Sequence, residues 1–77
     1  MKAAVQPGRR YRARIHLGVF EQVVSNAALA ERFKQVGFVD VSVTGSGRDR
    51  WAFGAWRGAA TEPVELPEQI IAVEEIP

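Results

Sequence analysis

The chain has 77 residues, of which 47% are hydrophobic and 25% charged, and its formal net charge is +1. This composition is typical of one small globular domain and argues against a wholly disordered chain. The absence of cysteine and the single histidine exclude disulfides, thiolate sites and multi-histidine metal sites. No apolar run approaches the roughly 20 residues that span a bilayer, and the first eight residues lack the apolar core of a secretory signal. We therefore expect a cytoplasmic location and no membrane insertion.

Charge is distributed unevenly along the chain. Residues 1–61 contain all ten Lys and Arg residues and four acids, whereas residues 62–77 contain five acids and no base. Such a division is typical either of a basic binding arm with an acidic tail or of two termini that pair in one sheet. The second interpretation is favoured.

The first predicted strand covers residues 11–17. Every second side chain in Tyr11–Leu17 is apolar, and the side chains between them are Arg12, Arg14 and His16. A period of two with one apolar face indicates a half-buried strand.

The second predicted element is an amphipathic helix between residues 20 and 36. Apolar side chains recur there at intervals of three and four, at Val23, Ala27, Leu29, Ala30, Phe33 and Val36. Ser25 and Asn26 are good N-cap residues, so the regular helix can begin only there, and Gly37 is placed to end it.

The remaining residues predict three more strands. Residues 38–44 and 50–57 alternate, and Thr44–Asp49 between them is typical of a hairpin loop. Residues 58–63 are expected to form a loop, Pro67–Gln69 can form a single turn, and the β-branched run Ile70–Ile76 predicts a closing strand. The expected fold class is α+β, in the order β-α-β-β and a final strand, with one helix on a mostly antiparallel sheet. Residues 1–8 are expected to be a flexible N-terminal segment and residues 9–77 a single domain.

The sequence offers little support for an enzyme. The acids near His16 are scattered, so no metal site is proposed, and no serine stands in a G-x-S-x-G turn. Gly45–Gly47 beside Arg48 and Arg50 could be read as a phosphate cradle, but it lacks the P-loop lysine and joins two strands, so a hairpin turn is favoured. We expect no catalytic residue, no cofactor and no metal.

The polar face of the first strand is the candidate partner-binding site. Trp51 and Phe53 are expected in the core, whereas Trp56 has the opposite phase and either is exposed or lies under the C-terminal segment. The candidate partner-binding residues are Arg10, Arg12, Arg14, His16 and Trp56. Cationic and aromatic side chains on an open sheet can hold single-stranded nucleic acid, although a sequence pI near 8.3 is low for such a protein.

Parts of the chain resemble the sporulation-related repeat, a small peptidoglycan-binding module with a β-α-β-β-α-β order. The similar residues are Arg14–Phe20, Asn26–Ala30, Gly37–Phe38 and Arg50–Gly54, all within residues 11–54. The resemblance implies peptidoglycan binding. However, the second helix of that family has no counterpart in residues 55–77, and the membrane-anchored envelope protein that usually carries the module is not evident, so no binding residue is transferred.

The function expected by elimination is a non-catalytic interaction or assembly subunit that associates with itself or with another protein. The strand at residues 70–76 could offer a sheet edge for this purpose. Single-stranded nucleic-acid binding and peptidoglycan binding are the alternatives.

Overall fold

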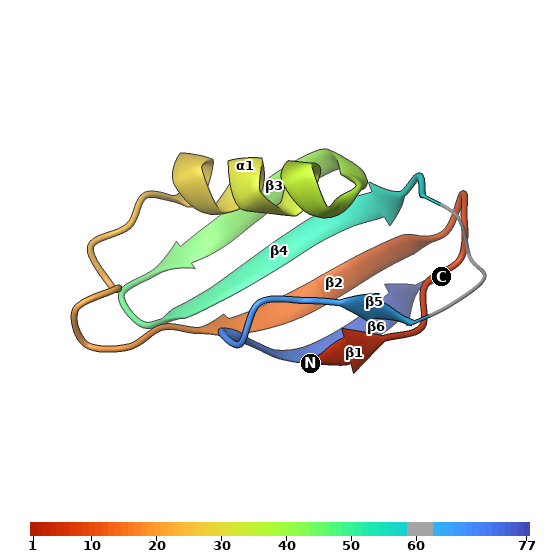
Figure 1. Cartoon of the computed structure of the whole chain (residues 1–77). Coiled ribbons are helices and arrows are strands. Elements are labelled where there is room, and N and C mark those ends of the chain that lie inside the picture. The colour runs from red at the N-terminus through yellow and green to blue at the C-terminus, as the bar shows by residue number, and fades with distance from the viewer. Residues whose placement is uncertain (59–62) are drawn as a thin grey trace.

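The computed structural model describes residues 1–58 and 63–77, and its fold class is the predicted α+β arrangement (Figure 1). The elements in chain order are β1 (Lys2–Ala3), β2 (Arg10–His16), α1 (Asn26–Val36), β3 (Phe38–Ser46), β4 (Asp49–Trp56), β5 (Val64–Glu65) and β6 (Ile70–Ile76). Most of the loop predicted at residues 58–63 lies outside the described residues.

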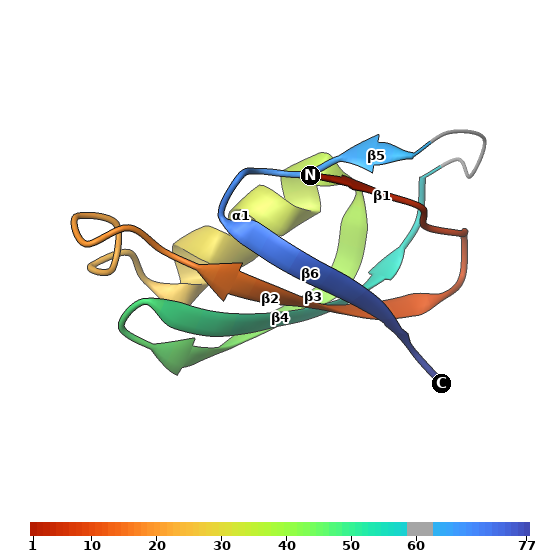
Figure 2. The ribbon, with the colours of Figure 1, turned by 90° about the horizontal axis from the view of Figure 1, so that it is seen from below.

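Four strands form one antiparallel sheet in the order β3-β4-β2-β6. The N-terminal β2 is central and the C-terminal β6 lies beside it, as Figure 2 shows from below. Arg12 pairs in register with Glu74, and their side chains form an ion pair. The prediction that the oppositely charged ends pair in one sheet is therefore confirmed, and β6 is an edge strand as expected.

Helix α1 begins where its N-cap predicts. The Ser25 hydroxyl accepts a hydrogen bond from the Ala28 N–H at 3.1 Å, and Gly37 ends the helix with a φ of 132°. Leu29 and Phe33 are its buried side chains. The predicted stripe is wrong at Val23, because that residue precedes the cap and lies outside the helix.

The N-terminal residues belong to the domain, which corrects the expected flexible segment at residues 1–8. β1 pairs with β5 in a separate two-stranded sheet, and Ala3 and Val5 lie in the hydrophobic core. Figure 2 shows this strand pair on the same side of the four-stranded sheet as α1. Two residues are too few to show a periodic pattern, so the sequence gives no signal for β1.

We call the sheet face that contacts α1 the inner face and the opposite one the outer face. Aromatic rings fill the core on the inner face. The ring of Phe38 lies edge-on to the rings of Tyr11, Phe33 and Trp56, with centroid distances of 6.5, 5.8 and 5.0 Å. Such edge-to-face contacts stabilise a core by about 0.5–1.5 kcal/mol each beyond the buried area.

Candidate functional site

The outer face carries four of the five predicted partner-binding residues. Arg10, Arg12, Arg14 and His16 are all exposed and alternate with the buried side chains of β2. Because α1 and the β1·β5 pair contribute to the core on the inner side, this face is open to solvent over the described residues.

Trp56 does not belong to this surface: strand 50–57 alternates as predicted, but the face that carries Trp56 is the buried one and the face that carries Trp51 is not. Trp56 is 5% exposed and lies in the core, whereas Trp51 is 38% exposed. Directly opposite residues of antiparallel strands share a face, and the register pairs Trp51 with Arg14. Phe53, paired with Arg12, is half-buried on the outer face and not in the core.

Two glycines make room for the Trp56 ring in the core. A Cβ at Gly37 would lie 2.9 Å from Cη2 of Trp56, and a Cβ at Gly58 would lie 2.5 Å from its Cζ2. Both distances are shorter than a carbon–carbon contact allows. Both glycines therefore serve packing, and Gly37 also supplies the positive φ that ends the helix.

Most charges on the outer face already have partners within the chain. Arg12 binds Glu74, and the Nδ1 of His16 lies 3.0 Å from a carboxylate oxygen of Asp49. That hydrogen bond holds the pKa of Asp49 below its ordinary value. The guanidinium carbons of Arg12 and Arg14 lie 5.6 and 5.9 Å from the centre of the Trp51 ring, within cation–π range.

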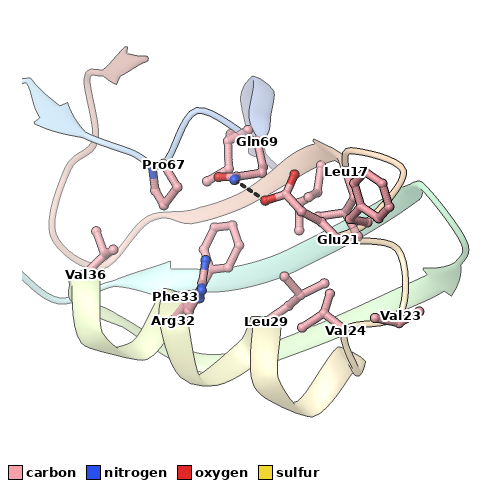
Figure 3. Close-up of a pocket in the computed structure, with 13 residues that line it drawn as sticks. Leu17, Glu21, Val23, Val24, Leu29, Arg32, Phe33, Val36, Pro67 and Gln69 are labelled. Atoms are coloured by element: carbon pink, nitrogen blue, oxygen red, sulfur yellow. Dashed lines mark hydrogen bonds between the residues drawn. The ribbon is translucent and has the colours of Figure 1, made fainter.

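A second candidate surface is an apolar groove of about 350 Å³ on the inner face, between α1 and the turn that precedes β6. Figure 3 shows Leu29, Phe33 and Val36 on the helix wall and Pro67 on the opposite wall. The floor contains Ile15 and Leu17 of β2 and Ile70 of β6. We refer to this feature as the groove.

The segment between β2 and α1 brings exposed apolar side chains to the groove. Phe20 is 93% exposed and Val23 is 88% exposed, and both line it. Sequence reasoning missed this surface because it placed both residues in or at the entrance of the helix.

Charged groups of opposite sign lie on the two walls of the groove. Glu21 accepts a hydrogen bond from the Gly18 N–H at 2.8 Å and another from the Gln69 amide at 2.6 Å (Figure 3). These bonds, Gly18 first, hold the pKa of Glu21 below its ordinary value, and the charge of Arg32 adds to the effect. Arg32 projects from the helix wall and has no carboxylate within ion-pair distance among the described residues.

A buried arginine holds the segment that carries Phe20 and Val23. Arg50 of β4 is 4% exposed and donates to the carbonyl oxygens of Gln22 at 2.9 Å and Val24 at 3.0 Å. It also donates to Asn26 Oδ1 at 2.7 Å and to the Gly47 carbonyl at 3.0 Å. The sequence offers one signal for this role: Arg50 has the same phase in the strand as Trp56, so the two side chains share a face.

The two-residue turn between β3 and β4 supports the hairpin interpretation of residues 44–49. Ser46 pairs with Asp49, and the Arg50 side chain turns inward to the contacts described above. Among the residues that the structure describes, no group of three His, Cys, Asp or Glu side chains could hold a metal ion. In the same residues, no helix has the length and apolar character needed to cross a membrane.

The resemblance to the sporulation-related repeat stays a prediction. Between β4 and β6, the described residues form β5 and a turn in place of a second helix. No protein-family model, curated protein or solved structure matches the chain.

Proposed function

We propose that the protein is a non-catalytic protein-interaction or assembly module and that its contact surface is the groove with Phe20 and Val23. The observation that carries the proposal is the near-complete exposure of these two side chains beside an apolar recess of about 350 Å³. A contiguous exposed apolar patch on a soluble domain marks an interaction site more often than scattered single residues do.

The size of the patch favours a contact of modest affinity. Phe20 and Val23 together expose roughly 300 Å² of apolar surface, taking about 200 Å² for a phenylalanine and about 100 Å² for a valine. Burying that area contributes about 7 kcal/mol at 25 cal/mol per Å². The loss of rigid-body freedom on association costs about 4–15 kcal/mol, so the groove walls must add further contacts.

The ordering of the segment around Phe20 lowers the cost of binding. Arg50 fixes the backbone at Gln22 and Val24, and Glu21 closes a turn on Gly18. A contact residue on a segment that is already ordered loses less conformational entropy on binding than one on a free loop. The groove lining formed by the described residues is largely apolar and contains no serine, threonine or histidine, which supports binding over catalysis.

Site-specific photocrosslinking tests the proposal. A photoreactive phenylalanine analogue placed at Phe20 should crosslink the chain to a protein in the cells that produce it. The same analogue at Lys34, exposed on α1 and absent from the groove lining, should give much less product. Equal crosslinking at the two positions, or none at either, would contradict the groove as a contact surface.

Single-stranded nucleic-acid binding by the outer face is a second candidate, because Trp51 lies between Arg12 and Arg14. An aromatic ring with cationic neighbours is the arrangement that stacks bases and neutralises phosphates. Binding of a mixed oligonucleotide should weaken steeply with salt and should be lost in Trp51→Ala. Affinity that is unchanged by salt or by this substitution would refute the role.

Peptidoglycan binding, which the family resemblance implies, is a third proposal. It predicts that the protein sediments with purified cell-wall sacculi and is found with the cell envelope. The assembly proposal includes a cytoplasmic location, so cell fractionation separates the two.

A further inference from the structure

The groove and its rim together provide both halves of a self-complementary contact. We propose, on the basis of the proposed function, that the occupant of the groove is a second copy of the chain related by a two-fold axis. In such a contact the same patch serves on both copies, so it must supply both the projecting side chains and the recess that receives them.

The shape of the patch meets this requirement. Phe20 and Val23 are the projecting side chains, and the recess lies directly beside them, since both line it. A two-fold axis that runs along the groove, in the plane of its mouth, sets the helix wall of each copy against the Pro67–Gln69 wall of the other. Each Phe20 can then be buried against the apolar groove of the second copy.

The charges on the rim match under the same symmetry. Arg32 lies on the helix wall and Glu21 on the opposite wall (Figure 3). The axis therefore faces each Arg32 with Glu21 of the second copy, and the contact gains two pairs of opposite charge.

The exposed area indicates how strong the dimer is. A stable interface buries at least about 600 Å² per partner, and Phe20 with Val23 supply roughly half of that. The groove walls and the charged rim supply the remainder. We therefore expect a reversible dimer with a dissociation constant in the micromolar range or weaker, about 1–100 µM.

Sedimentation velocity over a wide concentration range tests the proposal. The apparent mass of the purified chain should rise from 8.5 kDa towards twice that value between about 1 µM and 1 mM. Phe20→Ser should weaken the dimer by about tenfold or more, whereas Ile71→Ser, an exposed apolar side chain on β6 away from the groove, should leave it unchanged. Circular dichroism of each variant verifies the fold.

Charge reversal tests the orientation of the two copies. Arg32→Glu should weaken the dimer because the new carboxylate faces Glu21 of the second copy. Lys34→Glu on the same helix should have little effect because Lys34 does not line the groove. Adding Gln69→Lys to Arg32→Glu should restore part of the affinity by placing a cation beside the new carboxylate.

The outcomes separate this inference from the proposed function. A chain that stays monomeric up to about 1 mM overturns the dimer, as does a dimer that is insensitive to both Phe20→Ser and Arg32→Glu. If the purified chain is monomeric and the analogue at Phe20 crosslinks a different protein, the dimer fails and the proposed function stands. If it is monomeric and crosslinks nothing, both fail.

Discussion

Replacing Arg50 by methionine keeps most of the apolar stem of a buried side chain and removes all of its hydrogen-bond donors. Four acceptors lose their partner. Gln22 is exposed, and Gly47 lies in the hairpin turn with open space beside its Cα, so water can replace the guanidinium at these two carbonyl oxygens. The acceptors at Val24 and Asn26 belong to half-buried residues. An acceptor left without a partner at such a site costs about 1–3 kcal/mol.

The expected loss for Arg50→Met is therefore about 2–5 kcal/mol of unfolding free energy. This range allows for a partial offset, because the variant no longer has to desolvate a guanidinium on folding. We expect about 3 kcal/mol, which is a large part of the stability of a small domain. At about 4–8 °C per kcal/mol for a domain of this size, the Tm should fall by more than about 10 °C. Arg50→Lys keeps the charge and up to three donors, so it should lose less stability than Arg50→Met, although it cannot serve all four acceptors.

Urea denaturation followed by tryptophan fluorescence measures this loss. The matched control is Arg57→Met, an exposed arginine whose replacement should change the stability by less than about 0.5 kcal/mol. Amide hydrogen exchange should also show faster exchange of Val24 in Arg50→Lys, because its segment loses part of its anchor. If Arg50→Met is as stable as Arg57→Met, the four hydrogen bonds do not hold the segment.

Substitutions at three further positions test other features. Gly58→Ala should cost about 1–3 kcal/mol in thermal denaturation, because its Cβ would lie 2.5 Å from the Trp56 ring, and an unchanged Tm would contradict the packing. The pKa of Glu21 is depressed in the fold, chiefly by the Gly18 N–H, so its contribution is present above the ordinary carboxyl pKa and is lost as the pH falls through the folded value. The difference in stability between the wild type and Glu21→Gln, measured by urea denaturation, should therefore be constant near neutral pH and shrink below about pH 4–5, and a gap independent of pH would refute the reasoning. Asp40 has a φ of 53°, so Asp40→Val should destabilise by about 1–2 kcal/mol while Asp40→Gly should not, and equal Tm values for the two variants would contradict this.

Local patterns predicted most of the elements, because the signals for them lie within a few residues. The alternation of Tyr11–Leu17 gives β2, and Ser25 with Gly37 marks both ends of α1. The pairing of the two ends of the chain also follows from the sequence, since the bases of β2 and the acids of β6 attract each other.

The faces of β4 could not be assigned from the sequence alone. Trp51 and Phe53 alternate with Trp56, so both faces of that strand carry large aromatic side chains. Only the register with β2 decides between them, and it places Trp51 opposite Arg14. Register depends on contacts between residues far apart in the chain, which a local pattern does not contain.

The groove was equally inaccessible to a local analysis. Phe20 and Val23 continue the apolar spacing of the helix, and that spacing predicts burial. Two contacts decide otherwise: Glu21 closes a local turn on Gly18, and Arg50, which is distant in the chain, holds the backbone at Val24. Both are made by polar side chains for which the hydrophobic pattern gives no position.

The central place of β2 has a consequence for how the chain folds during its synthesis. β2 is made early, but its two neighbours, β4 and β6, follow much later. Ala13 of β2, for example, pairs with Ala52 on one side and with Val73 on the other, so its second partner is made 60 residues after it. Until then β2 has an unpaired edge that can join a strand of another chain. The sheet is therefore complete only once β6 has been made, and the charged side chains of Arg12 and Arg14 are well placed to discourage aggregation in the meantime.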